Sequence, residues 1–554
     1  MYLRLILLTL LSALLFPLAL PNELFLDGNP LVGLFCLSFF FWALYESPSF
    51  RSASLLGAVF GMVSTILANF WLKNFNEYAF YTLGGTTLGY IGLNALLAPL
   101  IKGIGELKPH LRPLFTAMVF CVYEYLKSTG FLAYPWGLIA YPVHNILPFI
   151  QFVDLTGIWG LSFLCSFFNS LLAEVYAKRF SQKKTPPYKC LRILSPLLKA
   201  QALFALALVL IAFTYGSLRL SLGFPADKSL RVLLVQQNID PWDSGKALAG
   251  LSAARTETLK GLNTSKTRWG SLPDLIVWSE TALRYAIDAK QEYPFKNNSF
   301  FYKYFPNLFS EFNTNTLTGA PVVAPLPGRY YNAAILINAK GQVTDFYAKQ
   351  HPVPFVESIP FMEIEPLREY FTNVLGLSNF WLMGKEAKTL TLLLADGSSV
   401  KIGVPICFED VFPDICRAFV LNGAELLINI ANDSWSKTKS ALTQHLAAAR
   451  FRAIETRRVL IRGTNAGLTC VVEPSGAISS SIPLFEQNHL LAEVAVAGTR
   501  QTTLYTILGD YLPYLFIIYL LSLMLIHAYP SLFTHLALKV KKIFSKTDFS
   551  KKNP

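Results

Sequence analysis

One cysteine of this chain ends an apolar run and is followed almost at once by two acids. In KIGVPICFED (residues 401–410), Cys407 closes the run, and Glu409 and Asp410 come after Phe408. A cysteine at the end of a buried strand can act as a nucleophile, but neighbouring carboxylates raise the pKa of a thiol and weaken it. Cys407 is therefore either an inert core residue or a nucleophile with compensating groups nearby.

A cysteine nucleophile needs a proton acceptor and a cation or donor for the developing oxyanion. Glu280 closes DLIVWSE (274–280), where a partly desolvated carboxylate can act as a base. Lys349 precedes an irregular Pro-rich loop in DFYAKQHPVPFVES (345–358), where it can hold a fixed positive charge. Taken singly, each also fits a bland role, as a solvated strand-end acid or an exposed loop lysine.

A histidine is the usual partner of a cysteine nucleophile, so a Cys–His pair stays open as an alternative. The same region offers His351, His445 and His489. A disulfide between Cys407 and Cys416 is a second alternative. No CxxC pair or Cys/His cluster has metal-ligand spacing, so we expect no metal and no cofactor.

The elements that must position these residues lie between positions 223 and 505. Short apolar runs, read as buried strands, alternate there with helical patterns, at 231–238, 274–280, 333–339, 400–407, 425–433 and 458–465. Residues 441–457 have helical periodicity with a cationic stripe. This alternation predicts an α/β fold whose sheets are covered by helices, with functional residues at the carboxyl ends of strands.

The 554-residue chain as a whole is strongly apolar: 53% of its residues are hydrophobic and only 15% are charged. Apolar runs of about 17 to 24 residues, long enough to cross a bilayer, recur along it. They lie near 2–20, 31–47, 54–73, 80–103, 113–129, 155–178, 198–221 and 511–533. The first resembles a signal peptide, but further spans follow directly, so we expect a retained helix.

Cations in short loops mark the cytoplasmic side of a membrane protein. They gather in the loop at 178–192, near 103–113 and in the tail after the last span. With about eight spans, both termini are predicted to be cytoplasmic and residues 223–505 to lie outside. The net charge of +13 is then mainly a topology signal, and we expect no nucleic-acid partner because the outer domain has no basic face interleaved with aromatic residues.

Three short motifs in order give the chain a recognisable resemblance. VWSETA with Glu280, AKQHPVPFVES with Lys349 and PICFED with Cys407 resemble the Glu–Lys–Cys set of the nitrilase superfamily. In a membrane-embedded chain, they resemble the apolipoprotein N-acyltransferases. Further matching motifs are VQQNI (235–239), YYNAAI (330–335), NDSW (432–435), residues 444–478, and YPWGLIAY (134–141) with Glu124 upstream.

The resemblance implies a polytopic helical domain and an inserted nitrilase-like domain, an α-β-β-α sandwich. The expected boundaries are 1–222 with seven transmembrane helices, 223–505 for the periplasmic catalytic domain, 506–535 for the last span, and 536–554 for a basic cytoplasmic tail. The implied location is the inner (cytoplasmic) membrane of a bacterium.

The resemblance also implies roles for single residues. Cys407 is the implied nucleophile, Glu280 the general base and Lys349 the stabiliser of the tetrahedral intermediate. The implied supporting or substrate-binding residues are Glu357, Phe408, Glu409 and Trp242. Apolar loop residues are candidates for a lid that excludes water: Phe355, Phe361 and Met362.

Several positions depart from the family pattern. Phe408 stands where a tyrosine usually follows the cysteine, and Ser279 replaces a proline before the base. Pro352 and Val356 replace a leucine and a glycine in the loop of Glu357. NDSWSK also lacks the usual Phe-Gly after the tryptophan. None of these changes touches the Glu–Lys–Cys set, so they bear on loop mobility and on acyl or headgroup preference.

The implied activity is transfer of an acyl chain from a membrane phospholipid to the α-amino group of a diacylglyceryl-cysteine at the N-terminus of an apolipoprotein. The mechanism would be ping-pong, through a Cys407 thioester, in a protein expected to be a monomer. One rival is a membrane-tethered amidase or nitrilase acting on a small amide. Another is a transporter or receptor whose outer domain has lost catalysis, against which the intact Glu280, Lys349 and Cys407 argue.

Overall fold

The computed structural model describes residues 1–130, 133–181, 195–240, 247–289, 307–354, 356–359, 364–374, 381–498 and 502–530. Six helices in these ranges are long and apolar enough to cross a membrane. They are α1 (Tyr2–Ala19), α4 (Phe50–Ala68), α5 (Gly85–Leu107, continuing from the turn Phe80–Gly84), α9 (Ile158–Ser181), α11 (Pro196–Ser221) and α18 (Tyr511–Ala528). The predicted polytopic helical domain is thus confirmed.

Two of the predicted spans are shorter helices than the sequence suggested. The run at 31–47 divides into α2 (Pro30–Gly33) and α3 (Ser38–Tyr45), and the run at 113–129 forms the 16-residue α6 (Arg112–Lys127). The apolar composition of these runs did not reveal where the helices end. Because α6 packs between α5, α9 and α18, it buries two charged side chains, Glu124 and Lys127, inside the protein.

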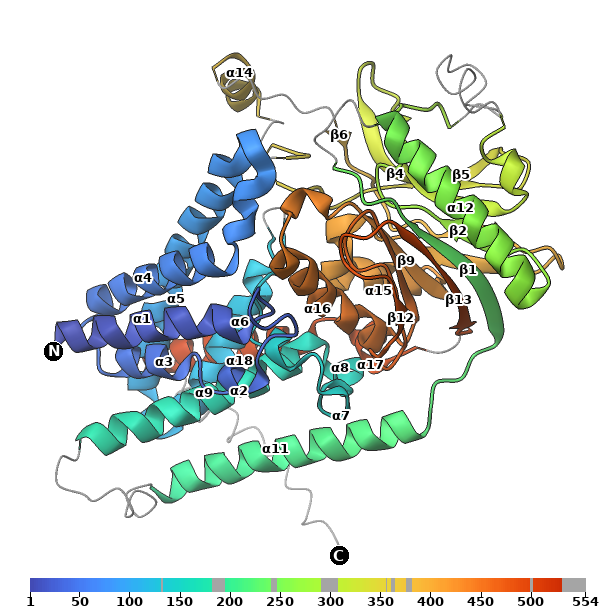
Figure 1. The fold of residues 1–554 in the computed structure, drawn as a ribbon. Coiled ribbons are helices and arrows are strands. Elements are labelled where there is room, and N and C mark those ends of the chain that lie inside the picture. Colours follow the sequence, from blue (N-terminus) through green and yellow to red (C-terminus); the bar gives the residue numbers. More distant parts are fainter. Residues whose placement is uncertain are drawn as a thin grey trace, which may run out of the picture.

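The helices α4 and α5 pack closely because two glycines of α4 face the backbone of α5. A Cβ atom at Gly57 would lie 2.1 Å from the carbonyl oxygen of Asn94, and one at Gly61 would lie 2.3 Å from that of Tyr90. Small residues permit such backbone approach between transmembrane helices. This pair of helices extends towards the soluble domain (Figure 1).

The soluble domain contains two mixed sheets. The first has the order β13-β1-β2-β3-β4-β5, and β6 pairs with β4. Its strands are β1 (Lys228–Gln236), β2 (Leu275–Val277), β3 (Asn315–Val323), β4 (Tyr330–Ile337), β5 (Val343–Ala348), β6 (Trp381–Leu382) and β13 (Asn488–Val496). The second has the order β12-β11-β10-β9-β8-β7. Its strands are β7 (Leu390–Leu393), β8 (Ser399–Gly403), β9 (Leu426–Ala431), β10 (Leu460–Thr464), β11 (Cys470–Val472) and β12 (Ile478–Ser481).

The two sheets face each other, with helices outside them (Figure 1). Alternate residues of β1 serve the two interfaces: Val232 and Leu234 pack in the core shared with the second sheet, and Leu233 and Val235 pack in the core that includes α12 (Ala247–Trp269). Helices α15 (Pro413–Leu421) and α16 (Lys439–Thr456) cover the second sheet. The predicted α-β-β-α sandwich is therefore confirmed.

The helix α16 also connects the sandwich to the membrane helices. It starts after Thr438, whose side chain accepts a hydrogen bond from the backbone of Ala441. Its Gln444 donates to the carbonyl oxygens of Pro21 and Ala68 and accepts from the indole of Trp136. These buried bonds fix the sandwich against the membrane domain.

Candidate active site

Cys407 stands at a sharp turn between a strand and a short helix. β8 ends at Gly403, and a 3₁₀ turn begins at Cys407 (Cys407–Val411). The φ of Cys407 is +50°, a conformation that is uncommon outside glycine and often found at functional sites. Asn429 holds the turn by donating to the carbonyl oxygens of Pro405 and Cys407, both at 3.0 Å.

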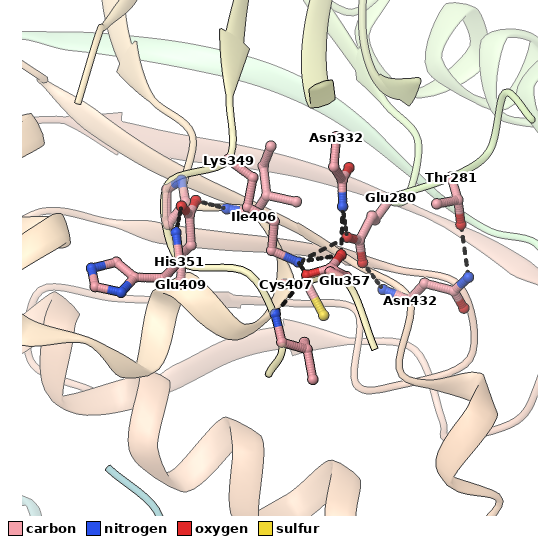
Figure 2. Close-up of polar contacts among 12 residues, drawn as sticks. Glu280, Thr281, Asn332, Lys349, His351, Glu357, Ile406, Cys407, Glu409 and Asn432 are labelled. Atoms are coloured by element: carbon pink, nitrogen blue, oxygen red, sulfur yellow. Dashed lines mark hydrogen bonds and ion pairs between the residues drawn. The ribbon is translucent and has the colours of Figure 1, made fainter. Parts of the chain in front are cut away.

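Glu280 and Lys349 meet beside this turn, although their strands belong to the other sheet. Nζ of Lys349 lies 3.2 Å from Oε1 of Glu280 and 2.9 Å from Oε1 of Glu357. Asn332 donates to both carboxylates at 2.8 Å, and the backbone N–H of Asn432 donates to Glu280 at 3.1 Å. The side chains of Glu280, Lys349 and Glu357 point towards Cys407 in Figure 2. The residues predicted from three separate motifs are thus neighbours in space.

The two acids after Cys407 are turned away from its thiol. Glu409 is fully buried and accepts hydrogen bonds from the backbone N–H groups of Ile406, Gln350 and His351. It therefore clamps the loop after Lys349 to the turn that bears Cys407 (Figure 2). Asp410 is paired with Arg462 and accepts from Nε2 of His445 at 2.7 Å. Each acid is thus held by partners of its own.

Burial and charge determine the resting protonation of the central groups. Burial raises the pKa of the Cys407 thiol well above its usual value, Glu280 adds to the rise, and Lys349 opposes it. Burial lowers the pKa of Lys349, but Glu280 and Glu357 outweigh this effect and hold the pKa well above its ordinary value. At neutral pH the site therefore rests as a thiol beside an ammonium group. A thiol in this state needs a base to take its proton before it can act as a nucleophile.

Phe408 faces a wall of aromatic side chains from the membrane domain. Its ring lies 6.0 Å from that of Trp136 and 6.3 Å from that of Tyr134, and Phe412 meets it edge-on at 4.9 Å. All four rings belong to an aromatic layer that crosses the boundary between the two domains. The residue next to the candidate nucleophile, Phe408, therefore contributes packing.

A cavity of about 640 Å³ runs along this boundary. Cys407 and Phe408 border it from the sandwich, and Tyr134 and Trp136 border it from the membrane domain. The lining also includes apolar side chains of α5 and of the preceding turns, among them Trp71, Leu72, Phe75, Leu88, Leu93 and Leu96. The candidate nucleophile thus opens onto an apolar space shared with a transmembrane helix.

Asp433 and His445 complete the surroundings of Cys407, and we did not single them out from the sequence as a pair. Sγ of Cys407 lies 3.9 Å from Oδ1 of Asp433, which lies 3.0 Å from Nδ1 of His445. His445 therefore reaches the thiol only through Asp433. The sequence offered a partial signal: Asp433 closes the apolar run at 425–433 as Cys407 closes the run at 400–407, and functional residues of such folds lie at the carboxyl ends of strands. The parallel pairing of β8 with β9 brings these two strand ends to the same edge of the sheet.

The other sequence-based alternatives have clear outcomes. His351 faces Asp414 and His489 faces Glu257, so neither pairs with the thiol. Cys407 and Cys416 are both free thiols. Ser279 donates to Oε1 of Gln237 at 2.6 Å, a bond that the usual proline cannot make.

Pro352 and Val356 are half-buried in the loop that carries Glu357. Trp242 and the three proposed lid residues, Phe355, Phe361 and Met362, lie outside the described residues.

Comparison with known proteins gives the same picture for both parts of the chain. The model of the apolipoprotein N-acyltransferase N-terminal domain matches residues 12–171, and the carbon-nitrogen hydrolase model matches residues 252–503. Apolipoprotein N-acyltransferase 2 of Treponema denticola is 38% identical over 91% of this chain and 93% of its own. Apolipoprotein N-acyltransferase 2 of Treponema pallidum is 34% identical over 89% of each chain. The apolipoprotein N-acyltransferase of Borreliella burgdorferi is 31% identical over 90% of this chain and 91% of its own. The chain therefore belongs to the apolipoprotein N-acyltransferase family, and it is a multi-pass membrane acyltransferase that serves lipoprotein N-acylation.

Proposed function

We propose that this enzyme transfers an acyl chain from a membrane phospholipid to the α-amino group of an N-terminal diacylglyceryl-cysteine, in two steps through a thioester on Cys407. The observation that carries the proposal is the apolar cavity between Cys407 and α5 (Gly85–Leu107). Both substrates are anchored in a bilayer, so their acyl chains need a lateral path to the nucleophile. A small soluble amide, the substrate of the rival amidase, would need no such path.

In the first step, Glu280 takes the thiol proton while Sγ of Cys407 attacks the ester carbonyl carbon. The oxyanion that forms is stabilised by the ammonium of Lys349, which Glu280 and Glu357 hold in place. The C–O bond of the ester then breaks, and Glu280 returns the proton to the departing lysophospholipid alkoxide. The products are a thioester on Cys407 and a lysophospholipid.

In the second step, the amine of the acceptor attacks the thioester carbonyl carbon. The C–S bond breaks, an amide forms, and Glu280 moves a proton from the amine nitrogen to the sulfur. Water would hydrolyse the thioester in competition with the amine. The aromatic layer around Phe408, with Trp136 and Tyr134, supports this scheme because it keeps the nucleophile next to an apolar space.

The proposed topology places the thioester on the outer side of the membrane. We assign residues 1–222 to seven membrane helices, 223–505 to a periplasmic catalytic domain, 506–535 to the last span and 536–554 to a cytoplasmic tail. The protein would be a monomer of the inner membrane with both termini in the cytoplasm. The basic loop at 178–192 and the lysines of the tail support this orientation.

The test is a transfer assay with enzyme reconstituted in phospholipid vesicles and a synthetic diacylglyceryl-cysteine lipopeptide. We expect the lipopeptide to gain the mass of one acyl chain and an N-acetylated lipopeptide to gain none. The matched variants are Cys407→Ser, which should abolish transfer, and Cys416→Ser, which removes another buried free thiol of the same domain. Release of ammonia from small amides without acyl transfer would instead support the amidase.

A further inference from the structure

Asp433 is the residue whose position the two-step scheme leaves unexplained. Its carboxylate borders the cavity next to Cys407, with Oδ1 at 3.9 Å from the sulfur. It is 6% exposed, so it is a buried anion on the wall of a mostly apolar space. An anion in such a place is costly unless it is paired, and paired anions in clefts are candidate functional groups.

The partners of Asp433 hold it in the charged form from behind. Nδ1 of His445 lies 3.0 Å from Oδ1, and Nη2 of Arg462 lies 3.6 Å from Oδ2. Burial alone would raise the pKa of Asp433, but His445 and Arg462 outweigh burial and hold it below its ordinary value. Asp410 binds the far sides of both His445 and Arg462 and so fixes them. Asp433 thus presents a carboxylate towards the cavity on a rigid support.

The charges around the nucleophile do not balance. Four carboxylates face three cations in the cluster around Cys407. The carboxylates are those of Glu280, Glu357, Asp410 and Asp433, and the cations are Lys349, Arg462 and the protonated His445. Glu409 is not counted, because burial raises its pKa to about 7. The cluster as a whole therefore carries one excess negative charge. This excess lies with Glu280 and Glu357, which share Lys349, because Asp410 and Asp433 are matched by Arg462 and His445. A neutral ester gains nothing from this charge, but a cationic substrate does.

The two substrates of the proposed reaction differ in charge at the reacting atom. The ester of the phospholipid is neutral, but the α-amino group of the acceptor is an ammonium ion at neutral pH. We propose that Asp433 binds this ammonium group and so selects the acceptor for the second step. This inference rests on the proposed function, because it assigns a residue to one of its two steps.

The proton balance of the second step gives Asp433 a clear task. The bound ammonium group carries three protons, and the amide nitrogen of the product carries one. One proton leaves the ammonium group for solvent, on the side of the Asp433 carboxylate, before the attack. Its loss frees the lone pair of the nitrogen. Glu280 takes the other when the C–S bond breaks and delivers it to the sulfur of Cys407. Asp433 thus places the amine within reach of the thioester carbonyl carbon.

The experiment compares two nucleophiles on the same acyl-enzyme. Asp433→Asn and the unchanged enzyme are first incubated with phospholipid, and the extent of the thioester on Cys407 is read by intact-protein mass spectrometry. The acyl-enzyme is then challenged with the lipopeptide or with hydroxylamine, which is uncharged at neutral pH. We expect the same extent of thioester in both proteins and the same rate with hydroxylamine. With the lipopeptide, we expect a loss of about 10- to 100-fold, mainly as a raised KM, because a charge-assisted bond is lost.

The controls separate this inference from the proposed function. Asp414→Asn removes an exposed carboxylate on α15, outside the cavity lining, and should leave both rates unchanged. If Asp433→Asn loses its thermal transition, the double variant Asp433→Asn/His445→Gln, which removes both paired charges, takes its place. Equal losses with both nucleophiles, or an undiminished rate with the lipopeptide, would overturn the role of Asp433. Absence of a thioester in the unchanged enzyme would instead contradict the proposed function itself.

Discussion

Nζ of Lys349 lies 3.2 Å from Oε1 of Glu280, although the two residues are 69 positions apart in the chain and follow different strands. Both side chains are buried; Glu357 also accepts from Lys349, and Asn332 and the backbone of Asn432 donate to Glu280. The arrangement keeps a cation and a candidate base in fixed geometry before any substrate arrives. Such preorganisation is the main source of transition-state stabilisation in enzymes that develop an oxyanion.

Replacing Lys349 by methionine should affect both stability and chemistry. It would leave Glu280 and Glu357 as buried charges without their cation, which typically costs about 3–5 kcal/mol. We expect a lower thermal midpoint and no detectable thioester on Cys407. The matched control is Lys388→Met, because Lys388 also pairs with a carboxylate, that of Asp345, but on the surface. Thioester formation within tenfold of the unchanged enzyme would refute the assigned role of Lys349.

The aromatic position after Cys407 should accept a tyrosine but not an alanine. Phe408 packs against Trp136 and Phe412, so Phe408→Ala would remove a ring from the wall of the cavity onto which Cys407 opens. We expect Phe408→Ala to lower stability by about 3 kcal/mol and to increase hydrolysis of the thioester relative to transfer. Phe408→Tyr keeps the ring and should retain the thioester extent of the unchanged enzyme. The ratio of free fatty acid to acylated lipopeptide measures the effect, and an unchanged ratio in Phe408→Ala would count against this role.

Two buried charges of α6 should influence which acyl chains are used. Nζ of Lys127 donates to the carbonyl oxygen of Trp136 at 2.9 Å, and Oε1 of Glu124 accepts from the backbone of Ile139 at 2.8 Å. Together they pin the segment that carries the cavity wall. We therefore expect Lys127→Met to reduce discrimination between phospholipids of different chain length in a competition assay.

The control for this prediction is a second buried lysine of the membrane domain. Lys102 donates to the carbonyl oxygen of Ser47 and does not border the cavity. Lys102→Met should leave the chain-length preference unchanged. Equal preference profiles for Lys127→Met and the unchanged enzyme would show that the segment is held by other contacts.

The pH dependence of stability should report the charge on His445. Burial lowers the pKa of His445, but Asp433 and Asp410 outweigh it and raise the pKa from 6.5 to about 9. Because this pKa is raised by folding, the stabilising effect is complete below pH 6.5 and is lost as the pH rises through about 9. The rise in the pKa of His445 on folding corresponds to a contribution on the order of 3 kcal/mol to the free energy of unfolding.

The measurement for His445 compares thermal midpoints of the unchanged enzyme and His445→Gln across this pH range. We expect the gap between them to be widest below pH 6.5, to narrow as the pH rises from 6.5 to about 9, and to level off at higher pH. A gap that is constant with pH would mean that His445 acts by packing rather than by charge.

How much of the molecule could be read from its sequence differs between elements. The three motifs around Glu280, Lys349 and Cys407 predicted residues that the fold brings together, because each motif follows a strand end. The role of Glu409 as a clamp could not be predicted, since its partners are backbone N–H groups of a distant loop. Apolar runs located the membrane helices, but they could not show that α6 is short and buried by its neighbours.

Asp433 illustrates the same limit from another side. Its motif, NDSW, was recognisable, but no spacing rule connects an aspartate after one strand to a histidine on the following helix. Only the parallel pairing of β8 with β9 places the aspartate beside the cysteine. Sequence motifs identify residues that matter, and the topology of the sheet decides which of them touch.

The most direct test of the account is intact-protein mass spectrometry of the detergent-purified enzyme after incubation with phospholipid. We expect a mass gain of one acyl chain that hydroxylamine removes. This gain should be absent in Cys407→Ser and should persist in Cys416→Ser. An unmodified enzyme, under conditions in which a relative such as the Treponema denticola protein acquires the adduct, would contradict the thioester on Cys407. An adduct that persists in Cys407→Ser would contradict it equally.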